Sequence, residues 1–173
     1  MRKWGKLIFK KILNYKDIKD TFKKINQIKN KVLVGGCFDI LHYGHLIFLE
    51  KAKNQGDYLI VALESDEFIF NHKKRPPFHK QDERAYILAN LIMVDLIIKL
   101  PYFTNDKEYE ELVRLVRPST IALTKGDPHY QKKKKQAKLV GAKIYLSPFI
   151  KNFSSRKIIK YATFLSHRTA EKN

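Results

Sequence analysis

The chain has 173 residues, of which 44% are hydrophobic and 12% aromatic, so it can bury a core as one domain, and a disordered chain is excluded. The single cysteine, Cys37, excludes a disulfide framework, and no apolar run approaches the roughly 20 residues that span a bilayer. Thirty-five basic residues against seventeen acidic ones give a net charge of +18. We interpret this excess mainly as lysine on solvated faces; attraction to anionic small molecules or to polyanions is the alternative.

Short apolar runs alternate with segments of helical periodicity along the chain. Helices are expected at residues 15–29, 43–55, 81–91, 106–116, 132–141 and from Ser154 or Ser155 onward, with a basic loop at residues 71–80. Buried strands are expected at Val32–Val34, Tyr58–Leu63, Leu96–Leu100, Thr120–Thr124 and Lys143–Leu146. Five buried strands joined by helices predict an α/β fold, a Rossmann-like doubly wound parallel five-stranded sheet in a single domain.

The expected organisation is a basic N-terminal helical extension at residues 1–30, a main domain at 31–166 and a tail at 167–173. Within the extension, residues 4–13 can place apolar and basic side chains on opposite faces of a helix. We expect this helix to pack on the domain or on a partner subunit; the rival interpretation is a short helix in a membrane interface.

The loop after the first strand carries the strongest chemical signal. Its glycines, Gly35 and Gly36, let the backbone approach a ligand closely. His42 and His45 are spaced i, i+3 and therefore face one side of the first helical turn, with Gly44 leaving room between them. Two imidazoles at a helix N-terminus form a site for phosphate oxygens. Ordinary capping residues or half of a metal site are the alternatives, but the spacing provides no third zinc ligand.

The same loop resembles the signature of the cytidylyltransferase-like nucleotidyltransferases, G-x-F-D-x-x-H-x-G-H, which is complete at Gly36, Phe38, Asp39, His42, Gly44 and His45. From about Tyr15 the chain is most similar to the heptose-phosphate adenylyltransferase domain, through Glu64-Ser-Asp, Arg75-Pro76, Arg84, Val94-Asp95 and Lys125-Gly-Asp. Glycerol-phosphate cytidylyltransferases and FAD synthetases are related. The resemblance implies transfer of a nucleotidyl group from an NTP to a phosphorylated small molecule, with release of pyrophosphate.

The resemblance also implies roles for individual residues. Catalysis is expected of His42, His45 and Lys74, and substrate binding of Arg75, Arg84 and Asp95. Nucleotide binding is expected of Gly36, Phe38, Asp39, Gly44, Lys125, Asp127, Ser154 and Ser155. Paired serines before a helix are also ordinary N-caps, and Lys73 to Arg75 could simply be a solvated loop. Arg156 stands where the family has a third hydroxyl residue.

A phosphate monoester is already anionic at pH 7, so the expected mechanism needs positioning and charge neutralisation rather than a base. Mg²⁺ is the expected cofactor, bridging triphosphate oxygens without a dedicated protein metal site.

The cytidylyltransferases carry arginines at places that match Ile92 and the neighbourhood of Phe149. Because neither Ile nor Phe can replace an arginine fork, we expect ATP over CTP and a sugar phosphate or similar acceptor over glycerol 3-phosphate. We further expect a cytoplasmic homodimer, with neither nucleic acid nor a membrane as partner. A non-catalytic nucleotide-binding module and a polyanion or membrane-surface binder remain as alternatives.

Overall fold

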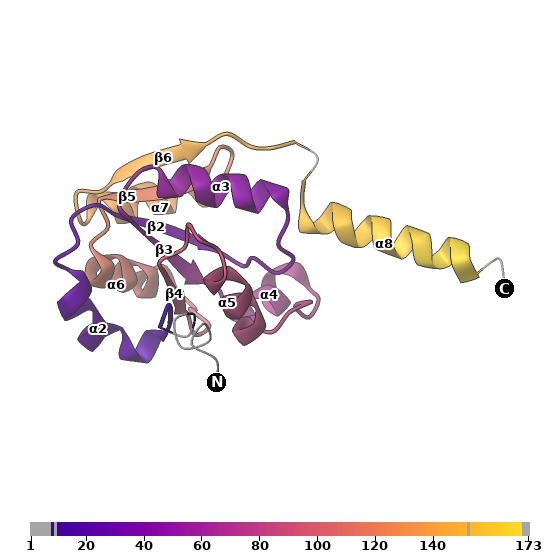
Figure 1. Ribbon diagram of the computed structural model, residues 1–173, viewed down its shortest axis with the longest axis horizontal. Coiled ribbons are helices and arrows are strands. Elements are labelled where there is room, and N and C mark those ends of the chain that lie inside the picture. The colour runs from indigo at the N-terminus through magenta and orange to yellow at the C-terminus, as the bar shows by residue number, and fades with distance from the viewer. Residues whose placement is uncertain (1–7, 9, 152, 171–173) are drawn as a thin grey trace.

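The protein is built around one six-stranded parallel sheet, with the strand order β1-β4-β3-β2-β5-β6 (Figure 1). The computed structural model describes residues 8, 10–151 and 153–170. The strands are β1 (Ile12–Asn14), β2 (Lys31–Gly36), β3 (Tyr58–Leu63), β4 (Leu96–Lys99), β5 (Thr120–Thr124) and β6 (Lys143–Ser147). The predicted α/β, Rossmann-like class is confirmed, with one strand more than the five that were predicted.

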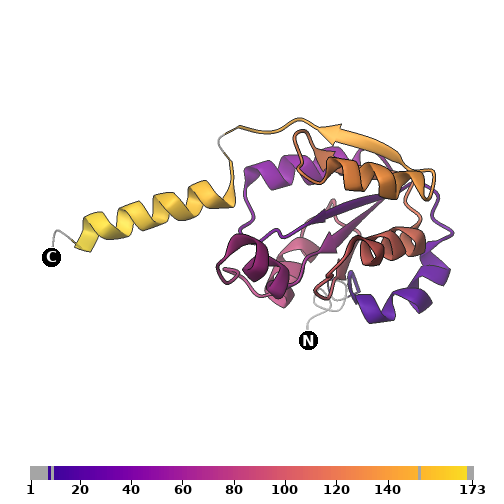
Figure 2. The ribbon, with the colours of Figure 1, turned by 180° about the vertical axis from the view of Figure 1, so that it is seen from behind.

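Helices cover both faces of this sheet. They are α2 (Ile18–Ile25), α3 (Tyr43–Lys53), α4 (Asp66–Lys73), α5 (Gln81–Ala89), α6 (Asp106–Val116), α7 (Tyr130–Lys138) and α8 (Ser155–Ala170), with a 3₁₀ turn, η1, at Tyr15–Asp17. Helices α3 and α5 pack on one face and α2, α6 and α7 on the other, as the views from the front and from behind show (Figures 1 and 2). Alternate strand residues enter the two cores: Val32 and Val34 face α3, and Leu33 faces the opposite layer. Burial on both faces explains why the strands are continuous apolar runs.

The sixth strand corrects the prediction for the N-terminal segment. Ile12 and Leu13 were expected to end an amphipathic helix, but they pair in parallel with β4, Ile12 opposite Ile97. An exposed strand edge offers unpaired backbone groups, and a short apolar segment can cover them. Residues 4–7 and 9 of the helix expected at residues 4–13 lie outside the described residues. The next predicted helix is confirmed, since α2 buries Ile18 and Phe22 in the core.

Helix α4 was not predicted, and its last turn occupies residues 71–73 of the expected basic loop. Ser65 caps it, because the Ser65 hydroxyl accepts a hydrogen bond of 3.1 Å from the Phe68 N–H. Lys74 ends the helix in the left-handed region, at φ 53°. The helix therefore directs the basic residues that follow it toward the carboxyl ends of the strands.

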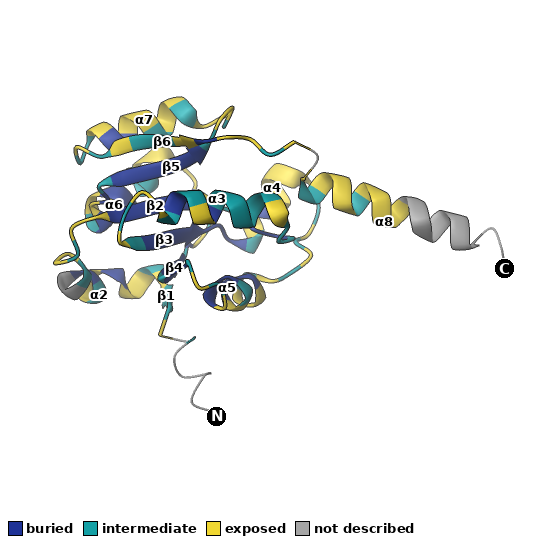
Figure 3. Cartoon of the chain, turned by 45° about the horizontal axis from the view of Figure 1, so that its top comes forward, coloured by how far each residue is buried: buried dark blue, intermediate teal, exposed yellow. Residues whose placement is uncertain are grey.

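The strand order reverses beside β2, since the chain moves outward through β3 and β4 and then returns to β5 on the other side of β2. Ligands of open α/β sheets bind at the carboxyl ends of the strands at such a switch point. Helix α8 extends away from this edge, and most of its described residues are exposed (Figure 3). None of the helices in the described part of the chain is long and apolar enough to cross a membrane.

A tight turn at Gly56 sets the approach of α3 to β3. A Cβ atom at this position would press on the Asn30 carbonyl oxygen and lie 2.8 Å from Cγ2 of Val32. We expect Gly56→Ala to lower the free energy of unfolding by about 2 kcal/mol, measured by urea denaturation, because the backbone at Asn30 and the side chain of buried Val32 must move. Asn54→Ala, in the same turn but exposed, should change it by less than about 0.5 kcal/mol. Equal effects of the two changes would show that the turn accommodates the methyl group.

Candidate functional site

The loop between β2 and α3 is shaped by its glycines and by Phe38. A Cβ atom on Gly36 would lie 3.0 Å from the Phe38 ring, so the missing side chain gives that ring its place. Phe38 is buried at a positive φ of 45°, which non-glycine residues rarely adopt. Phe38 and Gly36, both predicted nucleotide-binding residues, thus shape the loop. They line the small hollow of about 150 Å³ next to the main pocket.

His42 and His45 form a stacked pair at the start of α3, with ring centroids 3.8 Å apart and an angle of 22° between the planes. Burial lowers the pKa of His45 to about 3, helped by its neighbours His42 and Lys73, and burial also lowers the pKa of His42. Both imidazoles are therefore neutral at pH 7. Both Nδ1 atoms are buried and have no hydrogen-bond partner among the described residues. A pair of neutral imidazoles with unused ring nitrogens is suited to hydrogen-bond a ligand.

Gly44 leaves room beside the histidines, as expected from the sequence. A Cβ atom there would lie 3.2 Å from the His42 ring and 3.3 Å from Cβ of Phe153. Glycine therefore lets the imidazole and the segment before α8 approach the first turn of α3 together.

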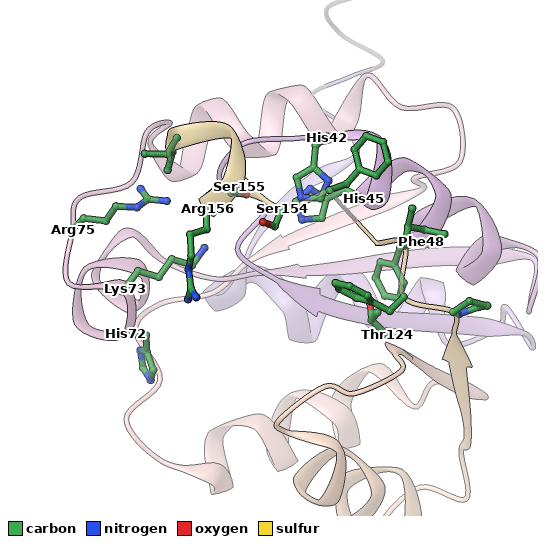
Figure 4. Close-up of a pocket in the computed structure, with 16 residues that line it drawn as sticks. His42, His45, Phe48, His72, Lys73, Arg75, Thr124, Ser154, Ser155 and Arg156 are labelled. Atoms are coloured by element: carbon green, nitrogen blue, oxygen red, sulfur yellow. The ribbon is translucent and has the colours of Figure 1, made fainter. Parts of the chain in front are cut away.

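The main pocket, called the histidine pocket below, has a volume of about 740 Å³ and opens at the carboxyl ends of β2, β5 and β6. Its polar lining comes from four separate segments of the chain (Figure 4): His42, His45, His72, Lys73, Arg75, Thr124, Ser154, Ser155 and Arg156. No aspartate or glutamate is among the described residues that line it. Lys73 and Arg156 in this lining have no recorded carboxylate partner, whereas Arg75 is paired with Asp39, so the lining keeps a net positive charge that favours an anionic ligand.

The predicted serines start α8 at the rim of this pocket. The Ser154 hydroxyl accepts a hydrogen bond of 3.2 Å from the Lys157 N–H, so it caps the helix while its own hydrogen stays available. The Ser155 hydroxyl donates to the Ile40 carbonyl oxygen at 3.3 Å and ties α8 to the loop after β2. The two serines therefore differ: Ser154 can donate to a ligand, and Ser155 positions the helix.

Asp39 joins the loop after β2 to the basic loop after α4. Its carboxylate is fully buried and accepts hydrogen bonds from the Arg75 guanidinium at 2.6 Å and from the N–H groups of Phe78 and His79 at 2.7 and 3.3 Å. Burial opposes ionisation, but these hydrogen bonds outweigh it and hold the pKa of Asp39 below its usual value. Asp39, predicted to bind nucleotide, acts on the site by positioning Arg75.

Arg84 corrects the prediction of a substrate contact. Its side chain is 1% exposed, and its guanidinium donates to the carbonyl oxygens of Cys37 and His79 and pairs with Asp66 at 2.7 Å. Each of its three nitrogens donates to a protein group, and two of the acceptors are carbonyl oxygens of the loops after β2 and before α5. Arg84 therefore has a structural role, which is to hold the loop after β2 in place.

Asp95 is also placed away from the pocket. It lies at the amino ends of the strands, where its carboxylate accepts from the Leu59 N–H and from Lys53, both at 2.7 Å. The predicted substrate contact is therefore corrected to a structural role at the opposite edge of the sheet.

The remaining predicted residues lie around the pocket with different exposures. Lys74 is exposed and is not among the lining residues, whereas its neighbours Lys73 and Arg75 are. Lys125 is exposed after β5, and Asp127 lines the small hollow and accepts from the His129 N–H at 2.7 Å. Sequence reasoning missed His72 and Thr124 as lining residues. Their signal was position alone: Thr124 is at the end of a predicted strand, and His72 precedes Lys73 and Lys74 in the expected basic loop.

The fold and this pocket together define an α/β protein with a basic pocket at the switch point of a Rossmann-like sheet. Residues 33–167 match the model of the cytidylyltransferase-like family, so this chain belongs to that family of nucleotidyltransferases. The membership predicted from the histidine motif is confirmed.

Named relatives agree with this assignment. The chain is 34% identical over 151 residues to the bifunctional protein HldE of Aliarcobacter butzleri, which covers 86% of this chain and 30% of that protein. It is 35% identical over 161 residues to HldE of Campylobacter jejuni, covering 92% of this chain and 33% of that protein. The FAD synthase of Thermococcus onnurineus is 40% identical over 101 residues, covering 58% of this chain and 65% of that protein. The chain thus spans about a third of the length of the HldE relatives.

Solved structures show the same fold. The lipopolysaccharide core biosynthesis protein from Thermoplasma volcanium aligns with a TM-score of 0.57 and 27% identity, over 72% of this chain and 98% of that one. The pantoate-beta-alanine ligase from Francisella tularensis aligns with a TM-score of 0.60 over 84% of this chain and 72% of that one. At 19% identity the ligase supports the fold alone.

The role of Arg84 can be tested by its stability. We expect Arg84→Met to lower the free energy of unfolding by about 3 kcal/mol, because buried carbonyl oxygens lose their donors. Urea denaturation measures the change, and Arg114→Met, at an exposed position of α6, is the matched control with an expected effect below about 0.5 kcal/mol. A stable Arg84→Met variant that fails only in substrate binding would restore the original prediction.

Proposed function

We propose that the protein transfers a nucleotidyl group, AMP in preference to CMP, from an NTP to the phosphate of a small acceptor such as a sugar phosphate, releasing pyrophosphate. The observation that supports this most directly is the stacked His42–His45 pair, which lines one pocket without aspartate or glutamate together with the start of α8. The similarity to HldE and to FAD synthase supports the same class of reaction.

In the proposed reaction an acceptor phosphate oxygen attacks the α-phosphorus in line. A bond forms between them, the bond from the α-phosphorus to the bridging oxygen breaks, and the electron pair leaves with pyrophosphate. The acceptor needs no base because it is already ionised at pH 7. The N–H groups of His42 and His45 donate to phosphate oxygens as negative charge moves toward the leaving group.

The triphosphate is proposed to lie between the histidines and the start of α8. The free hydrogen of Ser154 and the first N–H groups of α8 can donate to phosphate oxygens. Lys73 and Arg75 neutralise the leaving pyrophosphate from the opposite side, and Arg156 adds a further cation at the helix start. Lys73 thus takes the part that the sequence assigned to Lys74, because Lys73 is the one that lines the pocket.

Mg²⁺ fits this site only as a partner of the nucleotide. The described residues include no group of three histidine, cysteine or acidic side chains that could hold a metal. Mg²⁺ commonly keeps several waters and binds substrate phosphates, so the triphosphate itself would carry it. When bound there, it would neutralise phosphate oxygens alongside Lys73 and Arg75. The homodimer and the cytoplasmic location stay predictions.

Removing either imidazole should impair the chemical step. We expect His42→Ala and His45→Ala each to lower kcat by about 10² to 10³ in a pyrophosphate-release assay, as for loss of a transition-state donor. His79→Ala, which removes a half-exposed imidazole outside the pocket lining, should leave kcat within about threefold. Near-wild-type turnover by the His42 and His45 variants would refute their proposed roles, and the absence of turnover in the parent protein would favour a non-catalytic module.

The nucleotide preference can be tested by competition. Phe149 lines the histidine pocket where the cytidylyltransferases have an arginine nearby, whereas Ile92 lies on the surface near Asp95 and bears less on the pocket. We expect kcat/KM for ATP with a sugar 1-phosphate to exceed that for CTP with glycerol 3-phosphate by about tenfold, because apolar side chains cannot replace an arginine fork. FMN is the third acceptor, since FAD synthase is a relative. A tenfold preference for CTP and glycerol 3-phosphate would overturn this choice and leave the class of reaction intact.

A further inference from the structure

Arg156 lies in the first turn of α8 and lines the histidine pocket, at the position where the family has a third hydroxyl residue. The next two basic residues of this helix, Lys157 and Lys160, are exposed and are not among the lining residues. Within the described part of the chain, no carboxylate pairs with the Arg156 guanidinium. This departure from the family pattern therefore places an unpaired cation in the pocket.

The serines at the start of α8 leave few donors for a ligand. The Ser155 hydroxyl donates to the Ile40 carbonyl oxygen, and the Ser154 hydroxyl accepts from the Lys157 N–H, so only the hydrogen of Ser154 is unused. A guanidinium carries five N–H donors in a rigid fork that matches the oxygens of a phosphate. Arg156 therefore brings to this helix start both the donors and the charge that a hydroxyl lacks.

A second unpaired cation, Lys73, reaches the same pocket from the end of α4. It lies close enough to His45 to help lower the pKa of that imidazole. Arg75, the other cation of the lining, is already engaged, because its guanidinium pairs with Asp39 at 2.6 Å and donates to the Pro76 carbonyl oxygen at 2.8 Å. Lys73 and Arg156 repel each other in a pocket without a lining carboxylate, and an anion bound between them would relieve this repulsion.

The lining residues give the pocket two different ends. Lys73 and Arg156 lie at one end and Phe48 at the other, with His45 and Ser154 between them (Figure 4). The apolar end suits the nucleoside, since ligand pockets bury the flat part of a ligand against aromatic side chains. A triphosphate whose α-phosphorus lies at the histidines then extends toward the two cations.

We propose that Arg156, together with Lys73, binds the terminal phosphate of the nucleotide and so makes the protein select a nucleoside triphosphate over the diphosphate. This inference rests on the proposed transfer reaction and adds a specificity-determining residue to it. A diphosphate with its α-phosphorus at the histidines ends one phosphate short of the two cations and leaves them unpaired. The triphosphate reaches them, and the guanidinium fork donates two parallel hydrogen bonds to its terminal oxygens.

A solvated arginine on an exposed helix is the alternative. Lys160 provides the matched control, because it is an exposed cation one turn further along α8 and lies outside the pocket lining. Arg156→Ser restores a hydroxyl at the third position, and Arg156→Lys keeps the charge without the fork. Because Arg156 is exposed, both variants are expected to fold, which far-UV circular dichroism and the Tm verify.

The test compares two nucleotides that differ by a single phosphate. α,β-Methylene-ATP and α,β-methylene-ADP are titrated calorimetrically, with Mg²⁺ present, into the parent protein and each variant. We expect the parent to bind the triphosphate at least about tenfold more tightly than the diphosphate. Arg156→Ser should weaken triphosphate binding about tenfold and diphosphate binding less than about twofold, because only the triphosphate reaches the guanidinium. Arg156→Lys should lie in between, and Lys160→Ser should change neither affinity by more than about twofold.

Three outcomes would overturn the proposal. Unchanged triphosphate affinity in Arg156→Ser would show a solvated cation, and equal losses for the two nucleotides would show a general effect on the helix start. Unchanged nucleotide affinity with weaker binding of glycerol 3-phosphate would place Arg156 at the acceptor instead. These titrations measure binding without turnover, so failure of the transfer reaction would appear separately, as tight and triphosphate-selective binding without pyrophosphate release.

Discussion

The buried carboxylate of Asp39 is the interaction on which the site depends, because it joins two loops that have no strand pairing between them. It accepts hydrogen bonds from Arg75 and from the backbone of Phe78 and His79, so the basic loop closes over the end of β2. Arg84 holds the same two loops together by donating hydrogen bonds to the carbonyl oxygens of Cys37 and His79. An ionised, fully hydrogen-bonded acid in this position fixes the cations of the loop relative to the histidines.

The histidine pocket follows from that arrangement as a basic pocket in which the Nδ1 atoms of His42 and His45 have no hydrogen-bond partner among the described residues. The low pKa of His45 keeps its imidazole neutral, so the positive character comes from Lys73, Arg75, Arg156 and the start of α8. An incoming phosphate would supply the missing acceptors and favour protonation of the imidazoles.

Local sequence patterns predict most of the sheet and the part of the site that lies between β2 and α3. The strands Tyr58–Leu63 and Thr120–Thr124 and the helix at residues 106–116 have the predicted bounds, since apolar runs and capping residues are local signals. The His42–His45 pair was predicted for the same reason, as an i, i+3 spacing at a helix start. Strand β1 was missed because its pairing with β4 is a long-range property.

The missed or corrected site residues depend on contacts between distant segments. Arg84 was expected to reach substrate because of the family resemblance, and the helix sequence around it gives no sign that the side chain will be buried. Asp95 precedes β4, and only the direction of the strand shows that Asp95 lies at the amino ends of the strands, opposite the pocket. Lys133 stands within a run of four lysines, and its inward orientation depends on Tyr109 and Glu64, which come from other elements.

A crystal structure of the protein with α,β-methylene-ATP would test the central claim most directly. The account predicts that the phosphates lie in the histidine pocket, with phosphate oxygens within about 3.2 Å of nitrogens of His42 and His45 and of the first backbone N–H groups of α8. It also predicts that Asp39 keeps its hydrogen bonds to Arg75 and to the basic loop. Triphosphate bound elsewhere on the basic surface, with the imidazole nitrogens still unpartnered, would contradict the account.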